Sequence, residues 1–494
     1  MSDATTVSPE KAEANPGLGH PADAEWETVI GLEVHAELHT ETKLFCGAPN
    51  RFGGEPNTSI DPVSLGLPGT LPVLNRKAVE LAIRVGLALN CTVQPSTFAR
   101  KNYFYPDMPK DFQISQYEDP INIDGWLELP DGRRVGIERA HIEEDTGKST
   151  HVGGGGRLHG SGYSLVDYNR AGVPLIEIVG RPDLRNADDA RAYVSELRAV
   201  LVAIGASDGK MEEGSMRVDC NVSVRPMGEE RLGTRCEIKN VNSLRSLARA
   251  IEYESQRQID LLASGVPISQ ETRHWNEDDG RTHTLRSKEE ATDYRYFPEP
   301  DLVTLAPSAE WIEEIRAALP VLPAQRRHAL AEAAGIAPTE AALLVEREQD
   351  EFALAAIAAG ASPDGVVKHL ENNLADGVGE MSAETFAALS AMETSGELSA
   401  TQAKTVLAEL VASGGDPKSV AAAHGFEAMD TSELEGILDG IIAENAEEWE
   451  RFCTGDEGDQ KKMQGFFTGQ IMRATKGQAD GKVVAQLLGR RRSG

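Results

Sequence analysis

Residues 139–151 read RAHIEEDTGKSTH, which is an unusually dense run of ionisable side chains. Its thirteen positions hold three carboxylates, two histidines and two basic residues: Glu143, Glu144, Asp145, His141, His151, Arg139 and Lys148. Burying so many ionisable groups is costly unless a metal ion or a charged substrate neutralises them. A solvated loop would also tolerate such a run, so the interpretation depends on the sequence around it.

Two other stretches predict amphipathic β-strands with unusually acidic polar faces. In VIGLEVHAEL, residues 29–38, alternation places Glu33, His35 and Glu37 on one face. The opposite face is apolar and consists of Ile30, Leu32, Val34, Ala36 and Leu38. In MRVDCNVSVR, residues 216–225, the polar face consists of Arg217, Asp219, Asn221, Ser223 and Arg225. Both polar faces are too rich in charge for an ordinary hairpin surface.

The stretch at 139–151 is predicted to begin as a third strand. Its alternation would place Ile137, Arg139, His141 and Glu143 on a shared face. Glu144 would point away from them unless the strand ends or bulges there. Three strands that carry Glu, Asp and His predict one oxygen-rich cavity for a hard cation, and Mg²⁺ is the ion that such ligands favour.

The composition of the whole chain narrows the class of protein. Its 494 residues leave room for two to four domains. The net charge of −30 argues against a uniformly basic, nucleic-acid-binding surface, but local basic patches remain compatible with it. Five scattered cysteines without a CxxC pair are typical of a reducing cytosol. We find no apolar run near the roughly 20 residues of a membrane span and no secretory signal, so we expect a cytoplasmic protein.

Composition also divides the chain into four parts. Residues 1–24 lack a periodic apolar pattern, and we predict a disordered extension. Residues 25–302 alternate short strands with few helices, which predicts an α+β domain with a largely antiparallel sheet. An all-helical domain is expected over 303–412. A small helical tail domain is expected over 413–494, beyond a Gly-Gly-Asp-Pro break.

Apolar periodicity predicts three helices in particular. Two of them, over 77–90 and 188–204, interrupt the strands of the α+β region. The third, over 432–449, has a capping-box pattern at its start and a continuous apolar stripe.

Several catalytic motifs are excluded by their spacing. DTGKST at 145–150 resembles the end of a P-loop, but Ile142 stands where that motif requires glycine. The chain has no G-x-S-x-G elbow, and none of its cysteines lies in a recognisable nucleophile context. Carboxylates, histidines and basic residues without a covalent nucleophile favour phosphoryl transfer, in which positioning and Mg²⁺ provide most of the catalysis.

Two regions are candidates for contact with nucleic acid. RKNYFYPDMPKDFQISQ, residues 100–116, interleaves basic and aromatic residues, a pattern suited to pairing with phosphates and stacking on bases. Aromatic packing within a core loop would explain this run equally well. The C-terminal residues concentrate Lys and Arg on an otherwise acidic chain, and a solvated tail is the alternative there.

Long matching runs then identify a resemblance that covers nearly everything from residue 28 onward. They include VIGLEVHAEL at 29, LGLPGTLPVLN at 65, HIEEDTGKSTH at 141, SDGKMEEGSMRVDCNVSVRP at 207 and DYRYFPEPDL at 293. With these runs, the chain resembles the B subunit of the bacterial glutamyl-tRNA(Gln)/aspartyl-tRNA(Asn) amidotransferase.

The resemblance implies a specific activity. It makes residues 25–302 a catalytic cradle domain, which would use ATP and Mg²⁺ to phosphorylate the side-chain carboxylate of a tRNA misacylated with Glu or Asp. Ammonia from a separate amidase A subunit would then displace the phosphate, within a heterotrimer that includes a small C subunit. Neither a membrane nor DNA is an expected partner. The implied catalytic and metal-binding residues are Glu33, His35, Glu143, Glu144 and Asp219.

We also expect two sets of binding residues. Contacts with ATP and substrate are expected from Arg139, Lys148, Ser149, Arg217, Asn221 and Lys239. Contacts with tRNA are expected from Arg100, Lys101, Tyr103, Tyr105, Lys461, Lys462, Arg473 and Lys476.

The chain departs from the family's pattern at a metal site, and the helical region around 366–379 also follows the family only loosely. Many family members carry a four-cysteine zinc site of the form CxC followed by CPVC. This chain has Cys46-Gly-Ala48 and Asp61-Pro-Val-Ser64 at those positions, and one thiolate cannot hold structural zinc. We therefore expect no zinc.

Two other functional classes stay open at this point. A non-catalytic tRNA-binding scaffold of a larger complex would explain the basic and aromatic runs, but it has no need for acids beside His35. A free-standing ligase for a small carboxylate would use the acids but would not require the helical C-terminal half.

Overall fold

The computed structural model describes residues 25–153, 161–287, 293–426, 431–475, 479 and 481–493. The predicted disordered extension, residues 1–24, lies outside the described residues. The chain divides between residues 324 and 325 into two compact units.

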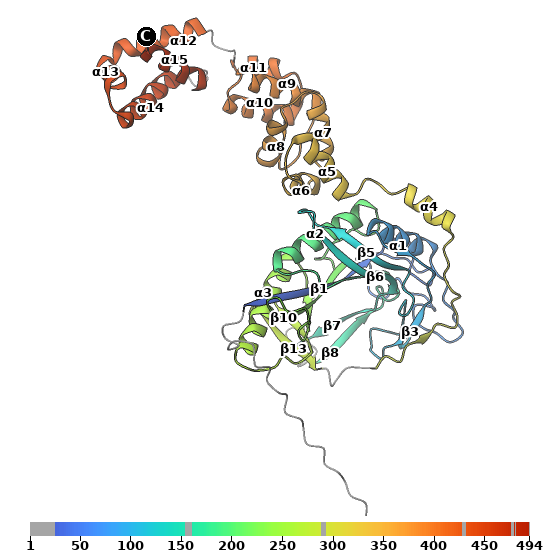
Figure 1. Ribbon diagram of the computed structural model, residues 1–494. Coiled ribbons are helices and arrows are strands. Elements are labelled where there is room, and N and C mark those ends of the chain that lie inside the picture. Colours follow the sequence, from blue (N-terminus) through green and yellow to red (C-terminus); the bar gives the residue numbers. More distant parts are fainter. Residues whose placement is uncertain are drawn as a thin grey trace, which may run out of the picture. The chain divides into compact units, whose positions relative to one another are not determined.

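A single mixed sheet dominates the N-terminal unit (Figure 1). Its strands, with the separate β7–β8 pair, are β1 (Trp26–Glu37), β2 (Thr92–Val93), β3 (Ala99–Asn102), β4 (Phe112–Ser115), β5 (Asn122–Glu128), β6 (Arg134–Glu144), β7 (Lys148–Val152), β8 (Tyr163–Asp167), β9 (Pro174–Gly180), β10 (Met216–Pro226), β11 (Cys236–Val241), β12 (Glu271–Asn276), β13 (Arg281–Ser287) and β14 (Phe297–Pro298). Among the described residues the large sheet has 12 strands, and its main path runs β13-β12-β11-β10-β1-β9-β6-β4-β3-β14. Within the part of the chain that the structure describes, β11 and β12 form the only parallel pair of this sheet, so the predicted α+β fold with a largely antiparallel sheet is confirmed.

Strands β1 and β10 have the predicted amphipathic alternation. They pair antiparallel, with Glu33 opposite Asp219 and His35 opposite Arg217. The alternate apolar residues predicted for β1 are at most 1% exposed, and those of β10 are at most 3% exposed: Met216, Val218, Cys220, Val222 and Val224. Burial of a continuous apolar face therefore fixes which face the acids occupy, because a shift by one residue would reverse every side chain.

Strand β6 contains an irregularity that the sequence did not predict. The register between β6 and β9 shifts between Ile137 and Arg139, which pair with Gly180 and Val179. This extra residue in β6 reverses the alternation, as a β-bulge does. Ile137 is fully buried in the apolar core, so the prediction that it shares a face with Arg139 was wrong.

Three helices cover the apolar face of the large sheet: α1 (Arg76–Ala88), α2 (Ala187–Ala203) and α3 (Leu244–Ala263). The first two confirm the predicted helices at 77–90 and 188–204, and each begins at an asparagine whose side chain accepts a backbone N–H. Helix α1 lies very close to strand β5. A Cβ added at Gly86 would lie 1.9 Å from Oδ1 of the buried Asn122, so only glycine fits there.

Helix α4 (Ala309–Ala317) also packs on the N-terminal core, through Ile315 and its neighbours. The N-terminal unit therefore extends beyond the predicted boundary at residue 302, to residue 324.

The second unit is helical. Its helices are α5 (Pro323–Ala334, which begins at the boundary), α6 (Pro338–Glu346), α7 (Asp350–Ala358), α8 (Pro363–Asn372), α9 (Ala383–Thr394), α10 (Ala400–Ser413), α11 (Pro417–Ala423), α12 (Thr431–Glu444), α13 (Ala446–Thr454), α14 (Glu457–Ala474) and α15 (Gly481–Ser493). They form two apolar cores, one built from α5–α11 and one from α12–α15. Because Ala421 is buried in the first of these cores, that core continues past the predicted break at 414–417. The helix predicted over 432–449 is interrupted at Asn445, which separates α12 from α13.

Within the described part of the chain, no helix is both long and apolar enough to cross a membrane.

Candidate active site

The polar face of the sheet aligns the predicted site residues in rows. Strands β10, β1, β9 and β6 lie next to one another. Residues that pair across antiparallel strands point to the same face, so their registers place side chains side by side. One row consists of Arg217, His35, Glu177 and His141. The neighbouring row consists of Asp219, Glu33, Val179 and Arg139.

Three side chains converge at the centre of this face: His35, Glu143 and Glu177. One ligand atom of each lies within 4.8 Å of the others, and we call this group the acid–histidine cluster. His35 Nδ1 lies 3.3 Å from Glu143 Oε1. Burial lowers the pKa of His35, but the hydrogen bond and charge of Glu143 raise the pKa above its usual value. Burial conversely favours protonation of Glu143, but His35 holds the pKa of this carboxyl below its usual range.

The pKa of His35 is thus shifted toward the imidazolium and the pKa of Glu143 toward the carboxylate, so the two groups stabilise each other's charged form. Metal ligation requires a neutral imidazole, so a divalent cation that used the His35 ring would displace its proton.

Further polar groups border the cluster. Asn221 Nδ2 donates to Glu33 Oε1 at 2.9 Å, and Lys239 Nζ lies 2.5 Å from Asp219 Oδ2. Burial and the charge of Glu177 raise the pKa of Glu33. His141 is buried with Nε2 3.5 Å from Glu177, and its Nδ1 has no hydrogen-bond partner within the described residues. The carboxylates in and around the cluster repel one another, and together they offer the oxygen ligands that a hard cation such as Mg²⁺ prefers.

Glu144 lies apart from the acid–histidine cluster. It follows Glu143 on the same strand, so its side chain points to the opposite face. There it accepts hydrogen bonds from Lys110 Nζ and from the backbone N–H of Ile114, the latter at 2.8 Å. Glu33, His35, Glu143 and Asp219 are thus brought together, whereas the metal-ligand role implied for Glu144 does not fit this placement.

Glu177 is the functional candidate that the sequence analysis missed. It lies in β9, where Leu175, Ile176, Ile178 and Val179 are all buried. A single carboxylate inside an apolar strand is the signal that could have identified it, because an isolated acid is costly to bury without a partner.

A cavity of about 670 Å³ lies beside this face, and its lining combines basic and acidic side chains in equal number. We call it the basic cavity after its cations, and its charged lining residues are Arg51, Lys148, Arg170 and Arg217 with Glu37, Asp167, Glu212 and Glu213. Arg217 and Arg170 lie 2.8 Å and 3.4 Å from the buried carboxylate of Asp145. Burial and the charge of Asp145 raise the pKa of Glu37 to about 7. Arg51, Lys148, Arg170 and Arg217 offer cationic partners for an anionic group, although the acids of the same lining balance their charge.

The residues expected to bind ATP and substrate are distributed around these features. Lys148 and Arg217 line the basic cavity, and Asn221 and Lys239 border the cluster. Arg139 lies 4.0 Å from Glu177 and contacts Glu138 at 2.9 Å. Ser149 is exposed on β7, next to Lys148.

The basic and aromatic residues at 100–105 already have partners within the protein. Arg100 forms a two-pronged ion pair with Glu299, at 2.6 and 2.9 Å, and Lys101 lies over the ring of Tyr294. Tyr103 and Tyr105 stack on each other, with ring centroids 4.9 Å apart. Tyr105 is 59% exposed, so this pair presents an aromatic surface to solvent.

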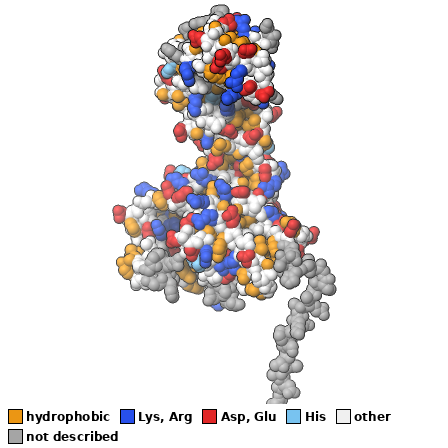
Figure 2. Space-filling view, turned by 90° about the vertical axis from the view of Figure 1, so that its left-hand side faces the viewer, with side chains coloured by type: hydrophobic (Ala, Val, Ile, Leu, Met, Phe, Trp, Pro, Cys, Tyr) orange, Lys and Arg blue, Asp and Glu red, His pale blue; other side chains and the backbone are white. Residues whose placement is uncertain are grey.

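The basic residues of the last helices lie on the surface. Lys461, Lys462 and Arg473 are exposed on α14, and Lys476 lies outside the described residues. On the faces shown in Figure 2, basic and acidic side chains are interspersed over both units. Cationic side chains are therefore accessible on the surface although the net charge of the chain is negative.

The loop near Cys46 is held by hydrogen bonds. Asp61 and Ser64 bond to each other reciprocally, with Ser64 N donating to Asp61 Oδ1 at 2.8 Å. Cys46 is a free thiol whose pKa is raised by burial.

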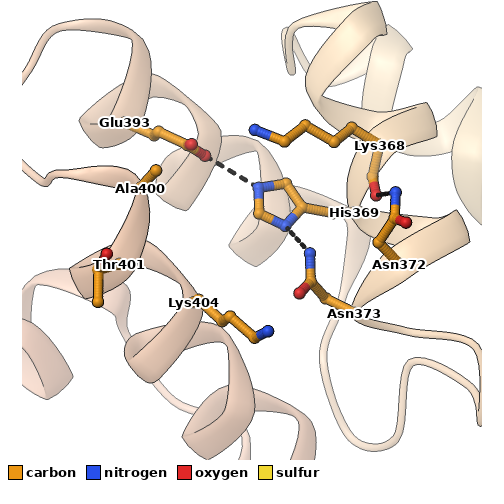
Figure 3. A pocket seen from close by; sticks show the side chains of 8 residues that line it. All are labelled: Lys368, His369, Asn372, Asn373, Glu393, Ala400, Thr401 and Lys404. Carbon is orange, nitrogen blue, oxygen red and sulfur yellow. Dashed lines mark hydrogen bonds and ion pairs between the residues drawn. The ribbon is translucent and has the colours of Figure 1, made fainter.

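A second cavity, of about 310 Å³, lies in the helical unit (Figure 3). His369 on α8 points into it, with Nε2 2.9 Å from Glu393 and Nδ1 3.1 Å from Asn373. Both ring nitrogens have partners, so His369 serves to join α8 to α9.

Comparison with known proteins gives a consistent family assignment. Residues 28–313 match the family described as the GatB/GatE catalytic domain, and residues 365–491 match the GatB domain. A relative from Kineococcus radiotolerans, by name the B subunit of an aspartyl/glutamyl-tRNA(Asn/Gln) amidotransferase, is 49% identical over 94% of this chain and 97% of its own length. Proteins of the same name from a Synechococcus strain and from Salinispora arenicola are 46% and 48% identical, over 96% and 94% of this chain and 99% and 96% of their own lengths.

Proposed function

Because the chain belongs to the family of aspartyl/glutamyl-tRNA(Asn/Gln) amidotransferase B subunits, we propose that the polar face of its sheet activates the side-chain carboxylate of glutamate or aspartate attached to tRNA. The chain is a subunit of a tRNA-dependent amidotransferase, a ligase complex of several subunits. Its N-terminal sheet performs the ATP-dependent step. A separate amidase A subunit and a small C subunit complete the proposed heterotrimer, in the cytoplasm.

The proposed reaction has two steps. One oxygen of the substrate carboxylate attacks the γ-phosphorus of ATP, and the bond to the bridging oxygen breaks, so that ADP leaves and an acyl phosphate forms. Ammonia, released from glutamine on the amidase subunit, then attacks the acyl carbon and phosphate leaves. A carboxylate is a poor electrophile, and the acyl phosphate supplies the leaving group that amidation requires.

The observation that carries this proposal is the convergence of His35, Glu143 and Glu177 on a face bordered by Glu33 and Asp219. These residues would hold Mg²⁺, with some of them acting through water, because Mg²⁺ keeps near-octahedral oxygen ligation. When bound, the ion would neutralise the charge of the phosphate oxygens during transfer. The buried His141, unpartnered at Nδ1 within the described residues, orients Glu177 from the neighbouring strand.

The basic cavity supplies cationic side chains for the nucleotide, next to an equal number of acidic ones. Lys148, Arg170 and Arg217 line it, and Asp145 holds the two arginines in place. Guanidinium groups bind phosphate oxygens with fixed geometry, so we assign this cavity to the phosphates of ATP.

The helical unit provides the contacts with the body of the tRNA in this proposal. The exposed Lys461, Lys462 and Arg473 on α14 support this role, since phosphate contacts come from such side chains.

The proposal is tested by replacing Glu143 with Gln in the heterotrimer. Formation of ADP should fall by about 100-fold or more with acylated tRNA, ATP and Mg²⁺, because an aligned charge in the transition state is lost. Glu138→Gln is the matched control, since Glu138 lies on the same strand with a 57% exposed side chain. Equal rates for Glu143→Gln and Glu138→Gln, with both variants folded in thermal melts, would remove this face as the activating site.

A further inference from the structure

A stack of tyrosines lies on the same side of the sheet as the acid–histidine cluster. The rings of Tyr117 and Tyr296 are nearly parallel, with centroids 3.9 Å apart and an interplanar angle of 9°. Tyr294 meets Tyr296 edge-on, at 6.3 Å and 75°. The two tyrosines that the sequence predicts as tRNA contacts, Tyr103 and Tyr105, form a different pair.

The strands that carry these tyrosines place them beside the cluster. Ser115 in β4 pairs with Glu143 in β6. Gln116 continues this register, because its N–H donates to Ile142 O at 3.2 Å and its side chain accepts from Ile142 N at 2.9 Å. Tyr117 comes next along the chain, one step after Gln116, so alternation directs it to the face of Glu143 and His141.

The segment that carries Tyr296 is fixed on the same edge. β14 pairs with β3, and β3 pairs with β4. Asn102 Nδ2 donates to the carbonyls of Tyr294 and Arg295, at 3.0 and 2.9 Å, and holds Arg295 in a left-handed conformation, with φ of 46°. A backbone held in this way positions the Tyr296 ring as a rigid support. Burial raises the pKa of Tyr296, and the charges of Glu143 and Glu177 raise it further, which agrees with its place near the cluster.

The stack is supported on one side and open on the other. Tyr117 remains 55% exposed although Tyr296 covers one face of its ring. An aromatic ring supported from behind and open in front is the arrangement on which proteins stack unpaired bases. The hydroxyl groups of Tyr117 and Tyr296 can hydrogen-bond with water, so the aromatic surface stays hydrated when no base is bound.

We propose that the outer face of Tyr117, supported by Tyr296, stacks on the unpaired 3′-terminal base of the acylated tRNA and so positions the attached carboxylate at the acid–histidine cluster. This inference rests on the proposed function. The adenine base of ATP could also stack on Tyr117. The position of the basic cavity, which we assign to the phosphates of ATP, argues against this alternative. That cavity includes Glu37 and Arg217, on the β1–β10 side of the cluster, whereas the tyrosines lie on the β4–β14 side.

The test uses the heterotrimer and an acceptor-stem RNA whose terminal base is 2-aminopurine, a fluorescent base that is quenched on stacking. Tyr117→Leu removes the ring and keeps an apolar side chain, and Tyr117→Phe keeps the ring as the matched control. We expect quenching with the unmodified protein and with Tyr117→Phe, and little quenching with Tyr117→Leu. Equal quenching with all three proteins would overturn the proposal.

Steady-state kinetics separate the two possible bases. Tyr117→Leu should raise the KM for acylated tRNA by about 10- to 100-fold, the range expected for one lost base–aromatic stack, and leave the KM for ATP unchanged. A rise in the KM for ATP instead would assign the stack to the nucleotide and overturn the proposal. If the unmodified heterotrimer formed no ADP with acylated tRNA, the proposed function itself would fail, whereas a normal KM in Tyr117→Leu would remove only the stacking role.

Discussion

Replacing Lys110 by Met leaves Glu144 buried without its cationic partner. The two side chains are only 8% and 3% exposed, so water cannot replace the lost ion pair. Removing one partner of a buried pair costs about 3–5 kcal/mol of unfolding free energy. Lys110 Nζ also lies 5.2 Å from the ring centroid of Phe112, so methionine loses this cation–π contact and keeps only an apolar side chain of similar length. We therefore expect Lys110→Met to destabilise the N-terminal unit by about 3 kcal/mol or more.

The double variant Lys110→Met with Glu144→Gln should recover most of this loss. A glutamine oxygen still accepts the N–H of Ile114, which Glu144 accepts at 2.8 Å, and no unpaired charge remains. We expect the double variant to lie within about 1–2 kcal/mol of the unmodified protein, so that the two changes couple strongly.

Urea unfolding followed by tryptophan fluorescence measures this coupling. Four of the five tryptophans lie in the N-terminal unit and Trp449 in the helical unit, so a Trp449→Phe background makes the signal specific for the N-terminal unit. Additive effects of Lys110→Met and Glu144→Gln would refute the reasoning, because they would show that Glu144 does not depend on Lys110.

Three further predictions concern the fold and the tRNA contacts. Gly86→Ala should destabilise the N-terminal unit by about 1–3 kcal/mol in urea unfolding, because the new Cβ would lie 1.9 Å from Asn122 Oδ1; unchanged stability would contradict the close packing. Burial raises the pKa of Glu254, but hydrogen bonds from Arg257 and Gln258 outweigh burial and lower this pKa below 4.5. The ionised form of Glu254 therefore stabilises the fold above pH 4.5, and this contribution is lost as the pH falls through the lower pKa of the folded state. Glu254→Gln should therefore unfold more easily than the unmodified protein at pH 7, with a gap that narrows below pH 4.5, and a gap independent of pH would contradict this. Deleting residues 431–494, after the first helical core, should weaken tRNA binding and reduce its salt dependence in filter-binding assays; binding unchanged at physiological salt would exclude α14 as a contact.

The sequence predicted the two central strands well because their pattern is determined by burial. β1 and β10 each bury one complete apolar face, and an exact period of two then places Glu33, His35 and Asp219 on the other face. In β6 the same reasoning failed at Ile137, because a bulge inserts one residue and alternation cannot reveal where this occurs.

Other parts of the site depend on pairings that no local pattern specifies. Glu177 joins His35 and Glu143 only through the order of β1, β9 and β6 in the sheet, which the sequence does not state. Glu144 was included through the family resemblance, although alternation already placed it on the other face. The extent of the N-terminal unit depends on α4, whose helical pattern suggested a helical domain but whose apolar side packs on the sheet domain.

Affinity for Mn²⁺, a spectroscopic substitute for Mg²⁺, tests the central claim most directly. Electron paramagnetic resonance would count free and bound Mn²⁺ for the unmodified heterotrimer and for Glu177→Gln, Glu144→Gln and Glu138→Gln. The cluster of His35, Glu143 and Glu177 predicts that Glu177→Gln weakens binding by about 10-fold or more, while Glu144→Gln and the exposed control Glu138→Gln bind as the unmodified protein does. Normal affinity in Glu177→Gln together with lost affinity in Glu144→Gln would contradict the assignment of the metal site to this cluster.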